Sequence, residues 1–337
     1  MTDLSATREF IQSLPKTETH LHIEGSLPWE LLEKKNPAKY ASQPSFRKDS
    51  FRYDSFEQFE SILIDHALDW FDSPESYYEA SKLIFAKQIE QNVKYVETSF
   101  HAGMMEFLKI PGEEILEAIL SAAPPQLEVR VFLGISRNAY TPYLGPLLEQ
   151  AIETWDSLAG IDLHGLESLP LEAWTQPFWK RASSCGKILK AHAGEFGPAK
   201  NVEQAVIDLG VRRIQHGVRA SESEKVMKLL LDEGVTLDLC PISNYKLRVV
   251  GEFEDHPIGS FMNHGIRCTV STDDPLSFNN SLHQEYEVLV DKMGFSAREI
   301  GRLAQNGFEV SDLEPDVRAS WQSQIIGLVD NVCSVDE

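Results

Sequence analysis

Short β-prone runs alternate along most of the chain with segments whose apolar residues recur at helical spacing. In the segment 56–70, Phe59 and Leu63 lie four positions apart, as neighbours on one face of a helix do. The run 93–100 is instead rich in β-branched and aromatic residues, a composition typical of a strand. On these criteria the predicted strands are residues 17–25, 93–100, 129–136, 158–163, 188–192, 211–216, 235–240 and 266–271.

Helical segments separate the strands in this prediction. Eight strands that alternate with helices are typical of a (β/α)₈ barrel, the α/β fold in which parallel strands close into a cylinder surrounded by helices. An open doubly wound sheet is the alternative, although no Gly-x-Gly-x-x-Gly follows the first strand, which argues against a dinucleotide site. We expect one domain over residues 1–337. It would carry a helical insertion at 30–75 that covers the active site, and a helical C-terminal segment from about residue 284.

The composition narrows the classes of partner. The chain has 337 residues, of which 42% are hydrophobic, so it can bury a substantial core. Its formal net charge of −21 argues against nucleic acid and anionic membranes, because binding to either needs basic patches. The same charge disfavours a phosphorylated substrate more weakly, since a local basic pocket could override it. We therefore expect a small-molecule substrate, with neither nucleic acid nor a membrane as a partner.

Cysteine usage and the N-terminal residues bear on the location of the protein. The four cysteines, Cys185, Cys240, Cys268 and Cys333, are widely spaced, which is typical of a reduced intracellular protein. Two of them, Cys240 and Cys268, lie in apolar runs and are expected to be buried. The first residues show no signal peptide, and no apolar stretch reaches the about 18 residues of a membrane span. The expected location is the cytoplasm.

The first predicted strand carries two histidines, His20 and His22, one residue apart. Alternate residues of a strand point to the same face, so both imidazoles are available to one metal ion. A His-x-His pair alone is a weak signal, because two histidines on a partly wet strand have the same pattern. The interpretation depends on whether other strands supply further ligands.

Polar residues also collect at the ends of later strands, where a barrel of this kind has its catalytic residues. Four of the ten histidines, His20, His22, His192 and His216, fall at such ends. Besides these histidines, the strand-end residues are Glu24, Asp162, Gly165, Glu195, Asp273 and Asp274. Three imidazoles and one carboxylate suit Zn²⁺, which makes water a nucleophile near neutral pH. A further carboxylic acid and a further histidine would complete a hydrolytic site.

Six motifs follow one another along the chain between Leu14 and Asn306. They are His20-x-His22, Gly160-Ile161-Asp162-Leu163, His192-Ala193-Gly194-Glu195, His216-Gly217, Cys240-Pro241-x-Ser243-Asn244 and Thr272-Asp273-Asp274-Pro275. Together they resemble the motifs of the adenosine deaminase family of metal-dependent hydrolases. Members of this family are (β/α)₈ barrels, in agreement with the strand count.

The resemblance implies a role for each matching residue. His20, His22, His192 and Asp273 correspond to the ligands of one Zn²⁺ ion per subunit. Glu195 corresponds to the acid that protonates purine N1, and burial would have to raise the pKa of its carboxyl group for this role. His216 corresponds to the residue that orients or deprotonates the attacking water. Asp274 corresponds to the carboxylate that contacts N7, and Gly165 to the backbone donor to N3. The implied reaction is a deamination in which protonation of N1 makes C6 electrophilic, water attacks and ammonia leaves.

Three further residues have two interpretations each. Asp162 either supports a metal ligand from behind or caps its strand. His164 replaces a small residue common in the family, and it either lines the pocket or faces solvent. His101, at the end of the second strand, is either a pocket residue or an ordinary loop histidine.

Two departures from the family pattern lie where the non-purine part of a substrate would bind. Glu24 stands where adenosine deaminases usually have an aspartate that contacts the ribose 5′-hydroxyl, and here the chain is similar to adenine deaminases. Residues 98–103 stand where many members have an Arg/Tyr-Ser-Pro-type segment. In contrast, Gly165 and residues 273–278 are more similar to the nucleoside enzymes, and residues 56–67 resemble the apolar helix that covers their substrate.

The resemblance therefore favours adenosine or deoxyadenosine as the substrate, with inosine or deoxyinosine as the product. Free adenine, N6-substituted adenines and aminodeoxyfutalosine are the alternatives. Two rival classes are a metal-dependent hydrolase of a non-purine substrate and a catalytically inactive binding relative. Glu195 next to Gly194 argues against the first, because an acid there suits protonation of a ring nitrogen. The complete set of ligands and acid argues against the second.

Overall fold

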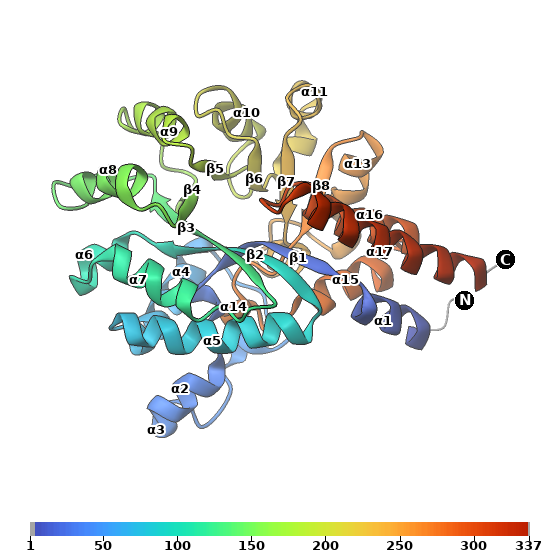
Figure 1. Cartoon of the computed structure of the whole chain (residues 1–337), viewed down its shortest axis with the longest axis horizontal. Helices are drawn as coiled ribbons and strands as arrows, with labels where there is room; N and C mark the ends of the chain where they lie inside the picture. The colour runs from blue at the N-terminus through green and yellow to red at the C-terminus, as the bar shows by residue number, and fades with distance from the viewer. Residues whose placement is uncertain (1–3, 336–337) are drawn as a thin grey trace.

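Eight parallel strands pair side by side in chain order, and helices surround them (Figure 1). The structure is a computed structural model and describes residues 4–335. Its strands are β1 (Lys16–His22), β2 (Val93–His101), β3 (Glu128–Ser136), β4 (Leu158–His164), β5 (Ile188–Ala193), β6 (Arg213–His216), β7 (Thr236–Leu239) and β8 (Arg267–Val270). The predicted (β/α)₈ barrel is confirmed, and the alternative of an open doubly wound sheet is wrong.

The segment after β8 meets β1 and nearly closes the barrel. Leu21 and Asp273 form an isolated parallel bridge there. The His22 N–H donates to the Asp273 carbonyl at 3.2 Å, and the Asp273 N–H donates to the His20 carbonyl at 3.1 Å. Barrel closure therefore places the two histidines of the first strand against an aspartate that follows the last one.

The helices occupy the connections between the strands. They are α1 (Leu4–Ser13), α2 (Trp29–Lys35), α3 (Pro37–Tyr40), α4 (Phe56–Trp70), α5 (Pro74–Glu90), α6 (Gly103–Leu108), α7 (Gly112–Ser121), α8 (Leu144–Thr154), α9 (Thr175–Ser184), α10 (Ala199–Ile207), α11 (Glu224–Asp232), α12 (Pro241–Lys246), α13 (Ile258–Asn263), α14 (Pro275–Phe278), α15 (Leu282–Asp291), α16 (Ala297–Glu309) and α17 (Pro315–Val335). Short 3₁₀ helices lie at Glu24–Ser26, Ser45–Arg47, Val218–Glu222 and Phe253–Asp255.

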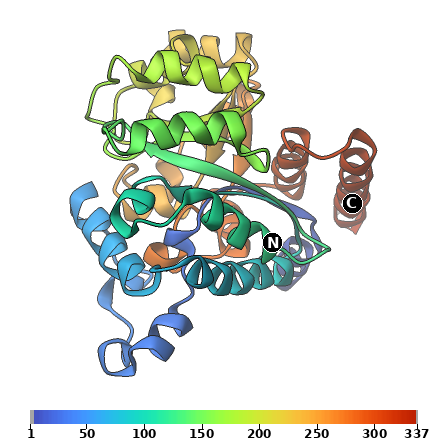
Figure 2. The same cartoon turned by 60° about the vertical axis from the view of Figure 1, so that its left-hand side comes forward.

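The segment expected as an insertion contains α2, α3 and α4. Helices α2 and α3 project away from the strands (Figure 2), whereas α4 packs against α14 and the 3₁₀ helix Glu24–Ser26. Trp29 is buried between the rings of Tyr40 and Phe46, with centroids 5.2 and 6.4 Å away, so this small unit has its own aromatic centre.

Helix α16 packs directly against the strands that meet at the barrel closure. Its Gly307 has no side chain, and a Cβ there would lie 1.9 Å from Thr17 Oγ1 of β1. The neighbouring Asn306 donates from Nδ2 to the Cys268 carbonyl of β8 at 2.9 Å. The C-terminal helices thus support the strands that carry His20, His22 and Asp273.

Buried ion pairs fill the barrel interior beneath these strand ends. Lys190 of β5 contacts the Glu97 carboxylate of β2 at 2.5 Å. Arg213 of β6 lies 2.9 Å from the carboxylates of both Glu97 and Asp238. Removal of one partner would leave an unpaired buried charge, which typically costs about 3–5 kcal/mol. Asp238 also reaches the site above, because its carbonyl lies 3.4 Å from His20 Nδ1.

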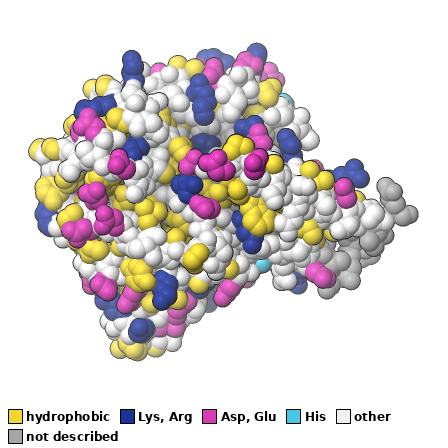
Figure 3. Space-filling view, in the orientation of Figure 1, with side chains coloured by type: hydrophobic (Ala, Val, Ile, Leu, Met, Phe, Trp, Pro, Cys, Tyr) yellow, Lys and Arg dark blue, Asp and Glu magenta, His cyan; other side chains and the backbone are white. Residues whose placement is uncertain are grey.

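The face seen in Figure 3 shows how charge is distributed on the surface. Lys and Arg side chains are scattered there among acidic and apolar ones, so the described residues of this face form no broad basic patch. The expected burial of Cys240 and Cys268 is confirmed, and all four cysteines are free thiols. None of the helices between residues 4 and 335 combines the length and the apolar character that a membrane crossing requires.

Candidate active site

A cavity of about 410 Å³ opens at the C-terminal ends of the strands. Its inner wall carries strand-end polar residues, and its outer wall comes mainly from apolar side chains of α4 and α6. The lining consists of His22, Glu24, Gly25, Phe56, Phe59, Glu60, Leu63, Ile64, Ala67, Leu68, His101, Gly103, Met104, Phe107, Ser136, His164, Gly165, His192, Glu195, His216, Leu247, Asp273 and Asp274. Within the described part of the chain, the cavity wall contains no lysine or arginine.

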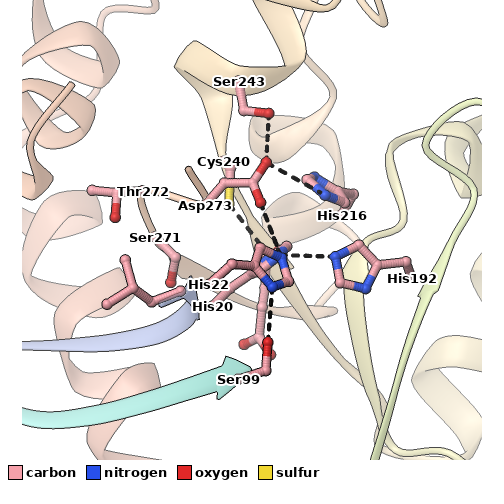
Figure 4. A network of polar contacts seen from close by, with 12 residues as sticks. His20, His22, Ser99, His192, His216, Cys240, Ser243, Ser271, Thr272 and Asp273 are labelled. Atoms are coloured by element: carbon pink, nitrogen blue, oxygen red, sulfur yellow. Dashed lines mark hydrogen bonds and ion pairs between the residues drawn. The ribbon is translucent and has the colours of Figure 1, made fainter. Parts of the chain in front are cut away.

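Three imidazole nitrogens and one carboxylate oxygen converge at the inner end of this cavity (Figure 4). His20 Nε2 lies 3.2 Å from His22 Nε2 and 3.1 Å from His192 Nε2. Asp273 Oδ1 lies 3.3 Å from the Nε2 atoms of both His20 and His22. Four ligands at about 2.0–2.1 Å from a tetrahedral zinc ion stand about 3.3–3.4 Å from one another. The measured separations therefore suit a single metal ion of this size.

The second nitrogen of each ring has a partner that directs Nε2 toward the cluster. His22 Nδ1 pairs with Ser99 Oγ at 2.8 Å. His192 Nδ1 lies 3.2 Å from the Leu163 carbonyl and 3.3 Å from an Asp162 carboxylate oxygen. Both oxygens only accept hydrogen bonds, so His192 carries its proton on Nδ1 and keeps the Nε2 lone pair for a metal. Asp162 thus lies behind the candidate ligand His192, in line with the first of its two interpretations.

Electrostatics also prepare the cluster for a cation. Burial lowers the pKa of His20, which keeps its ring neutral and able to bind a metal. Burial opposes ionisation of Asp273, but the histidines beside it outweigh this effect and hold the pKa of Asp273 well below its usual range. The Ser243 hydroxyl donates to Asp273 Oδ2 at 2.7 Å, so Oδ1 remains directed at the histidines.

Glu195 presents a buried carboxyl group to the same cavity. Its Oε1 is buried and has no hydrogen-bond partner among residues 4–335. Burial raises the pKa of Glu195 well above its usual value, and the negative charges of Asp273 and Glu167 raise it further. The raised pKa favours the neutral carboxylic acid, the form that can donate a proton to a bound molecule.

A chain of hydrogen bonds sets the tautomer of His216. The Ile258 N–H donates to His256 Nδ1 at 3.2 Å, so His256 carries its proton on Nε2 and donates to Asn244 Oδ1 at 3.1 Å. The amide of Asn244 then donates from Nδ2 to His216 Nδ1 at 3.1 Å. Burial lowers the pKa of His216 well below its usual value, so the ring is neutral and its proton is on Nε2. This Nε2 lies 3.6 Å from Glu195 Oε2, facing the cavity.

Glu24 lies in the cavity wall and is anchored on one oxygen. Its Oε1 accepts hydrogen bonds from the Tyr77 hydroxyl at 2.7 Å and from the His101 N–H at 3.1 Å. Burial raises the pKa of Glu24. The carboxyl group therefore has a defined position in the wall, set by α5 and the end of β2.

Asp274 and Gly165 both line the same cavity. Asp274 Oδ1 is buried without a hydrogen-bond partner among the residues described. Burial and the charge of Asp273 raise the pKa of Asp274 well above its usual value, which favours its protonated form. Gly165 follows β4 with a φ of +83°, in the left-handed region that glycine adopts without strain.

The two histidines with open interpretations, His101 and His164, both line the cavity. Their rings are stacked, with centroids 4.8 Å apart and planes inclined by 19°. The Gly103 N–H donates to His101 Nδ1 at 2.9 Å, so the Nε2–H of His101 donates to Ser136 Oγ at 2.9 Å. The structure therefore places His164 in the pocket rather than toward solvent, and His101 with it.

Comparison with known proteins identifies the family. The family model described as adenosine deaminase matches residues 15–328. The chain belongs to the adenosine deaminase family. An adenine deaminase of Ectopseudomonas mendocina is 32% identical to it over 315 residues, which cover 89% of this chain and 98% of that protein. An adenine deaminase of Pseudomonas fluorescens is 29% identical over 316 residues, covering 91% and 99%. The crystal structure of an adenine deaminase from Arthrobacter aurescens has a TM-score of 0.85 at 24% identity, covering 94% of this chain and all of that one.

In this adenosine deaminase-family chain, the structure brings all nine candidate site residues into or directly behind one cavity. The sequence analysis did not identify Ser99, His256 and Glu167 as site residues. They lie outside the cavity wall and form hydrogen bonds with His22, Asn244 and the Glu195 backbone, respectively. Ser243 and Asn244 belonged to a recognised motif, which was the available signal for them. His256 carried no such signal, because it lies outside the recognised motifs and acts on the site through its hydrogen bond with Asn244.

Proposed function

We propose that this protein catalyses the zinc-dependent hydrolytic deamination of a 6-aminopurine, producing a 6-oxopurine and ammonia. The observation that carries the proposal is the buried carboxyl group of Glu195, with one oxygen free of hydrogen-bond partners among residues 4–335, beside a cluster of three imidazoles and one carboxylate in a single cavity. A hydrolase acting on an acyl or phosphoryl group would not need an acid aimed at a ring nitrogen. Deamination of an aromatic amine does need one, because protonation of the ring makes the adjacent carbon electrophilic.

The donor set is the reason for proposing zinc. Imidazole nitrogens and one carboxylate oxygen are ligands that zinc commonly takes, and the separations of 3.1–3.3 Å suit tetrahedral coordination. We assign His20, His22, His192 and Asp273 as the ligands. A zinc ion held there supplies the Lewis acidity that makes water nucleophilic near neutral pH.

The side chains around the assigned ligands supply the proton transfer and hold the attacking water. Glu195 donates its proton to N1, which draws electrons away from C6. Water then adds to C6, and one of its protons passes to the departing amino group. The C6–N bond breaks to release ammonia, and the remaining hydroxyl proton returns to Glu195 as the C6 carbonyl forms. His216 holds the attacking water by donating from Nε2, because the Asn244 amide already occupies Nδ1 as a donor. Of the two roles that the family resemblance allows for His216, this tautomer favours orientation of the water over deprotonation.

Two further wall residues hold the purine ring. A protonated Asp274 can donate to N7, whose lone pair accepts hydrogen bonds, and its partnerless Oδ1 suits that role. The Gly165 N–H is assigned to N3. With Glu195 at N1, these contacts fix the ring in one orientation and place C6 next to the metal cluster.

The cavity wall favours an uncharged substrate. A 5′-phosphate would need a basic partner, and neither lysine nor arginine belongs to the lining in the described residues. Free adenine is the first candidate, because the relatives at 29–32% identity are adenine deaminases matched over nearly their whole length. Glu24 agrees with it, since this residue is where the chain is similar to adenine deaminases. The initial preference for adenosine has no such support from the relatives.

Adenosine or deoxyadenosine remains a second candidate because of the cavity's size. About 410 Å³ lies within the range of about 300–1,000 Å³ that accommodates drug-sized ligands, which is more room than a bare purine requires. Side chains of α4 and α6 line the outer part of this cavity. We propose that α4, from the insertion at 30–75, covers this part of the site.

Ammonia release tests the proposal directly. The zinc-loaded protein would be assayed with adenine, adenosine, deoxyadenosine and AMP, with cytosine as a pyrimidine control. We expect turnover of adenine and little turnover of AMP. A zinc-loaded protein that deaminates none of the purines would refute the proposed function, whereas turnover of adenosine in preference to adenine would reverse only the order of the two candidates.

A further inference from the structure

Four consecutive backbone N–H groups of the loop that carries Glu195 converge on one side chain, Glu167. Its Oε1 accepts from Gly194 at 2.5 Å. Its Oε2 accepts from Glu195 at 3.0 Å, from Phe196 at 2.9 Å and from Gly197 at 2.8 Å. Glu167 is buried in the loop that follows β4. The loop between β5 and α10 is therefore folded around a carboxylate supplied by the neighbouring strand's loop.

This arrangement requires a carboxylate and excludes close substitutes. Asn201 of α10 adds a fifth donor, because its Nδ2 lies 3.0 Å from Glu167 Oε1. Each oxygen of Glu167 thus faces donors, so the side chain acts as an acceptor in all five of these hydrogen bonds. A glutamine at this position would turn an NH₂ group toward backbone N–H groups and would leave at least one of them without an acceptor.

Gly197 lets the loop approach this closely. A Cβ at this position would lie 2.2 Å from Asn201 Nδ2 and 2.5 Å from Glu167 Oε1. Any side chain there would displace the carboxylate from the loop. The identities of Glu167 and Gly197 are therefore coupled by contact, although one follows β4 and the other follows β5.

We propose that Glu167 is a positioning residue for the reaction, which holds the backbone of Glu195 so that its carboxyl group is aimed at the substrate ring. This proposal rests on the proposed function of Glu195 as the acid. Glu167 is behind the loop and is absent from the cavity wall, so it acts through Glu195. The hydrogen bonds from residues 194–197 to Glu167 begin two residues after His192, the assigned metal ligand on the same segment. They therefore fix the position of the Glu195 acid relative to His192.

The size of the expected effect follows from the geometry of proton transfer. An acid must lie about 2.6–3.2 Å from the atom it protonates, and a displacement of about 1 Å can cost about 10²-fold in rate. Loss of the Glu167 bonds releases the loop that holds Glu195. We expect Glu167→Gln to lower kcat by about 10²-fold, while KM changes by less than about threefold because the purine contacts of Asp274 and Gly165 remain.

The test is a double-mutant cycle on the zinc-loaded full chain, with the best purine substrate. Glu167→Gln is measured in the wild-type background and again in a Glu195→Gln background, with zinc content determined for each protein. We expect the second measurement to show less than about a twofold effect, because a positioning residue has nothing left to position. Glu172→Gln is the matched control. Glu172 lies in the same loop, its exposed carboxylate accepts from Trp174 Nε1, and its change should leave activity unaltered.

Each outcome decides between explanations. An equal loss in both backgrounds would overturn the proposal, because a general structural defect does not depend on Glu195. Normal kcat in Glu167→Gln would also overturn it. Full activity of Glu195→Gln would instead refute the role of Glu195 in the proposed function. If Glu167→Gln fails to fold, Gly197→Ala displaces the same carboxylate and enters the same cycle, and Asn201→Ala removes only the fifth donor and should cost less.

Discussion

The role assigned to Glu195 is tested by its replacement with glutamine, which keeps the volume of the side chain and removes the transferable proton. Glu195 Oε1 has no hydrogen-bond partner among residues 4–335, and Oε2 lies 3.6 Å from His216 Nε2, so the change breaks no strong hydrogen bond within the protein. Stability should therefore change little. The effect should fall on the chemical step.

General acid catalysis typically contributes about 10²–10⁴-fold in rate. At about 1.36 kcal/mol for each factor of ten, Glu195→Gln should raise the activation barrier by about 2.7–5.4 kcal/mol. KM should remain within a few-fold, because the glutamine amide can still donate a hydrogen bond to N1. Bound zinc should be unchanged, since Glu195 is not among the four assigned ligands.

The assay is steady-state ammonia release across a range of pH, together with zinc determination by atomic absorption. Glu195 must be protonated to act, and burial raises its pKa well above the usual value. Wild-type activity should therefore be present below that raised pKa and should be lost as the pH rises through it, whereas the residual activity of the variant should lack this step. Glu60→Gln, in the α4 wall of the cavity, is the matched control. A zinc-loaded Glu195→Gln protein with kcat within tenfold of wild type would refute the reasoning.

Three other predictions concern the tautomer, the specificity and the metal. Asn244→Asp replaces the donor to His216 Nδ1 with an acceptor, so the ring proton moves to Nδ1. We expect kcat at neutral pH to fall at least about tenfold and to recover partly as the pH falls, because a doubly protonated ring again donates from Nε2. A loss of kcat that does not depend on pH would contradict this prediction. Glu24→Asp withdraws the carboxylate by about 1.5 Å from Tyr77 and His101. The change should alter the ratio of kcat/KM for adenine to kcat/KM for adenosine. If both kcat/KM values change by the same factor, Glu24 does not determine which size of substrate is preferred. Removal of zinc with a chelator should lower the melting temperature, because free zinc at about 100 times its Kd stabilises the folded protein by about 2.7 kcal/mol. An unchanged melting temperature after verified zinc removal would argue against zinc binding at this cluster.

The close spacing of His20, His22 and His192 explains why these tests must keep the metal cluster intact. His20 Nε2 lies 3.2 Å from His22 Nε2 and 3.1 Å from His192 Nε2, and nitrogen lone pairs turned toward one another at such distances repel unless a cation lies between them. A variant that loses zinc would therefore lose more than one function at once. Zinc content has to accompany every kinetic measurement for this reason.

Much of the fold and most of the assigned site residues could be predicted from the sequence. The alternation of strand-like and helix-like segments depends on each segment's own residues, so its period is visible in one dimension. Strand-end chemistry is visible for the same reason, since parallel strands bring their C-terminal ends to one face whatever lies between them. His20 and His22 on the first strand and His192 on the fifth were predictable on this basis.

The sequence by itself determined which groups meet at the end of the barrel, and the tertiary structure decided what state they are in. The tautomer of His216 depends on a relay through Asn244 and His256 that no local pattern encodes. The aim of Glu195 depends on Glu167, whose five donors come from a different strand's loop and helix. Protonation and orientation arise from burial and from contacts between distant segments. Only the packed barrel, which excludes water and brings those segments together, could set them.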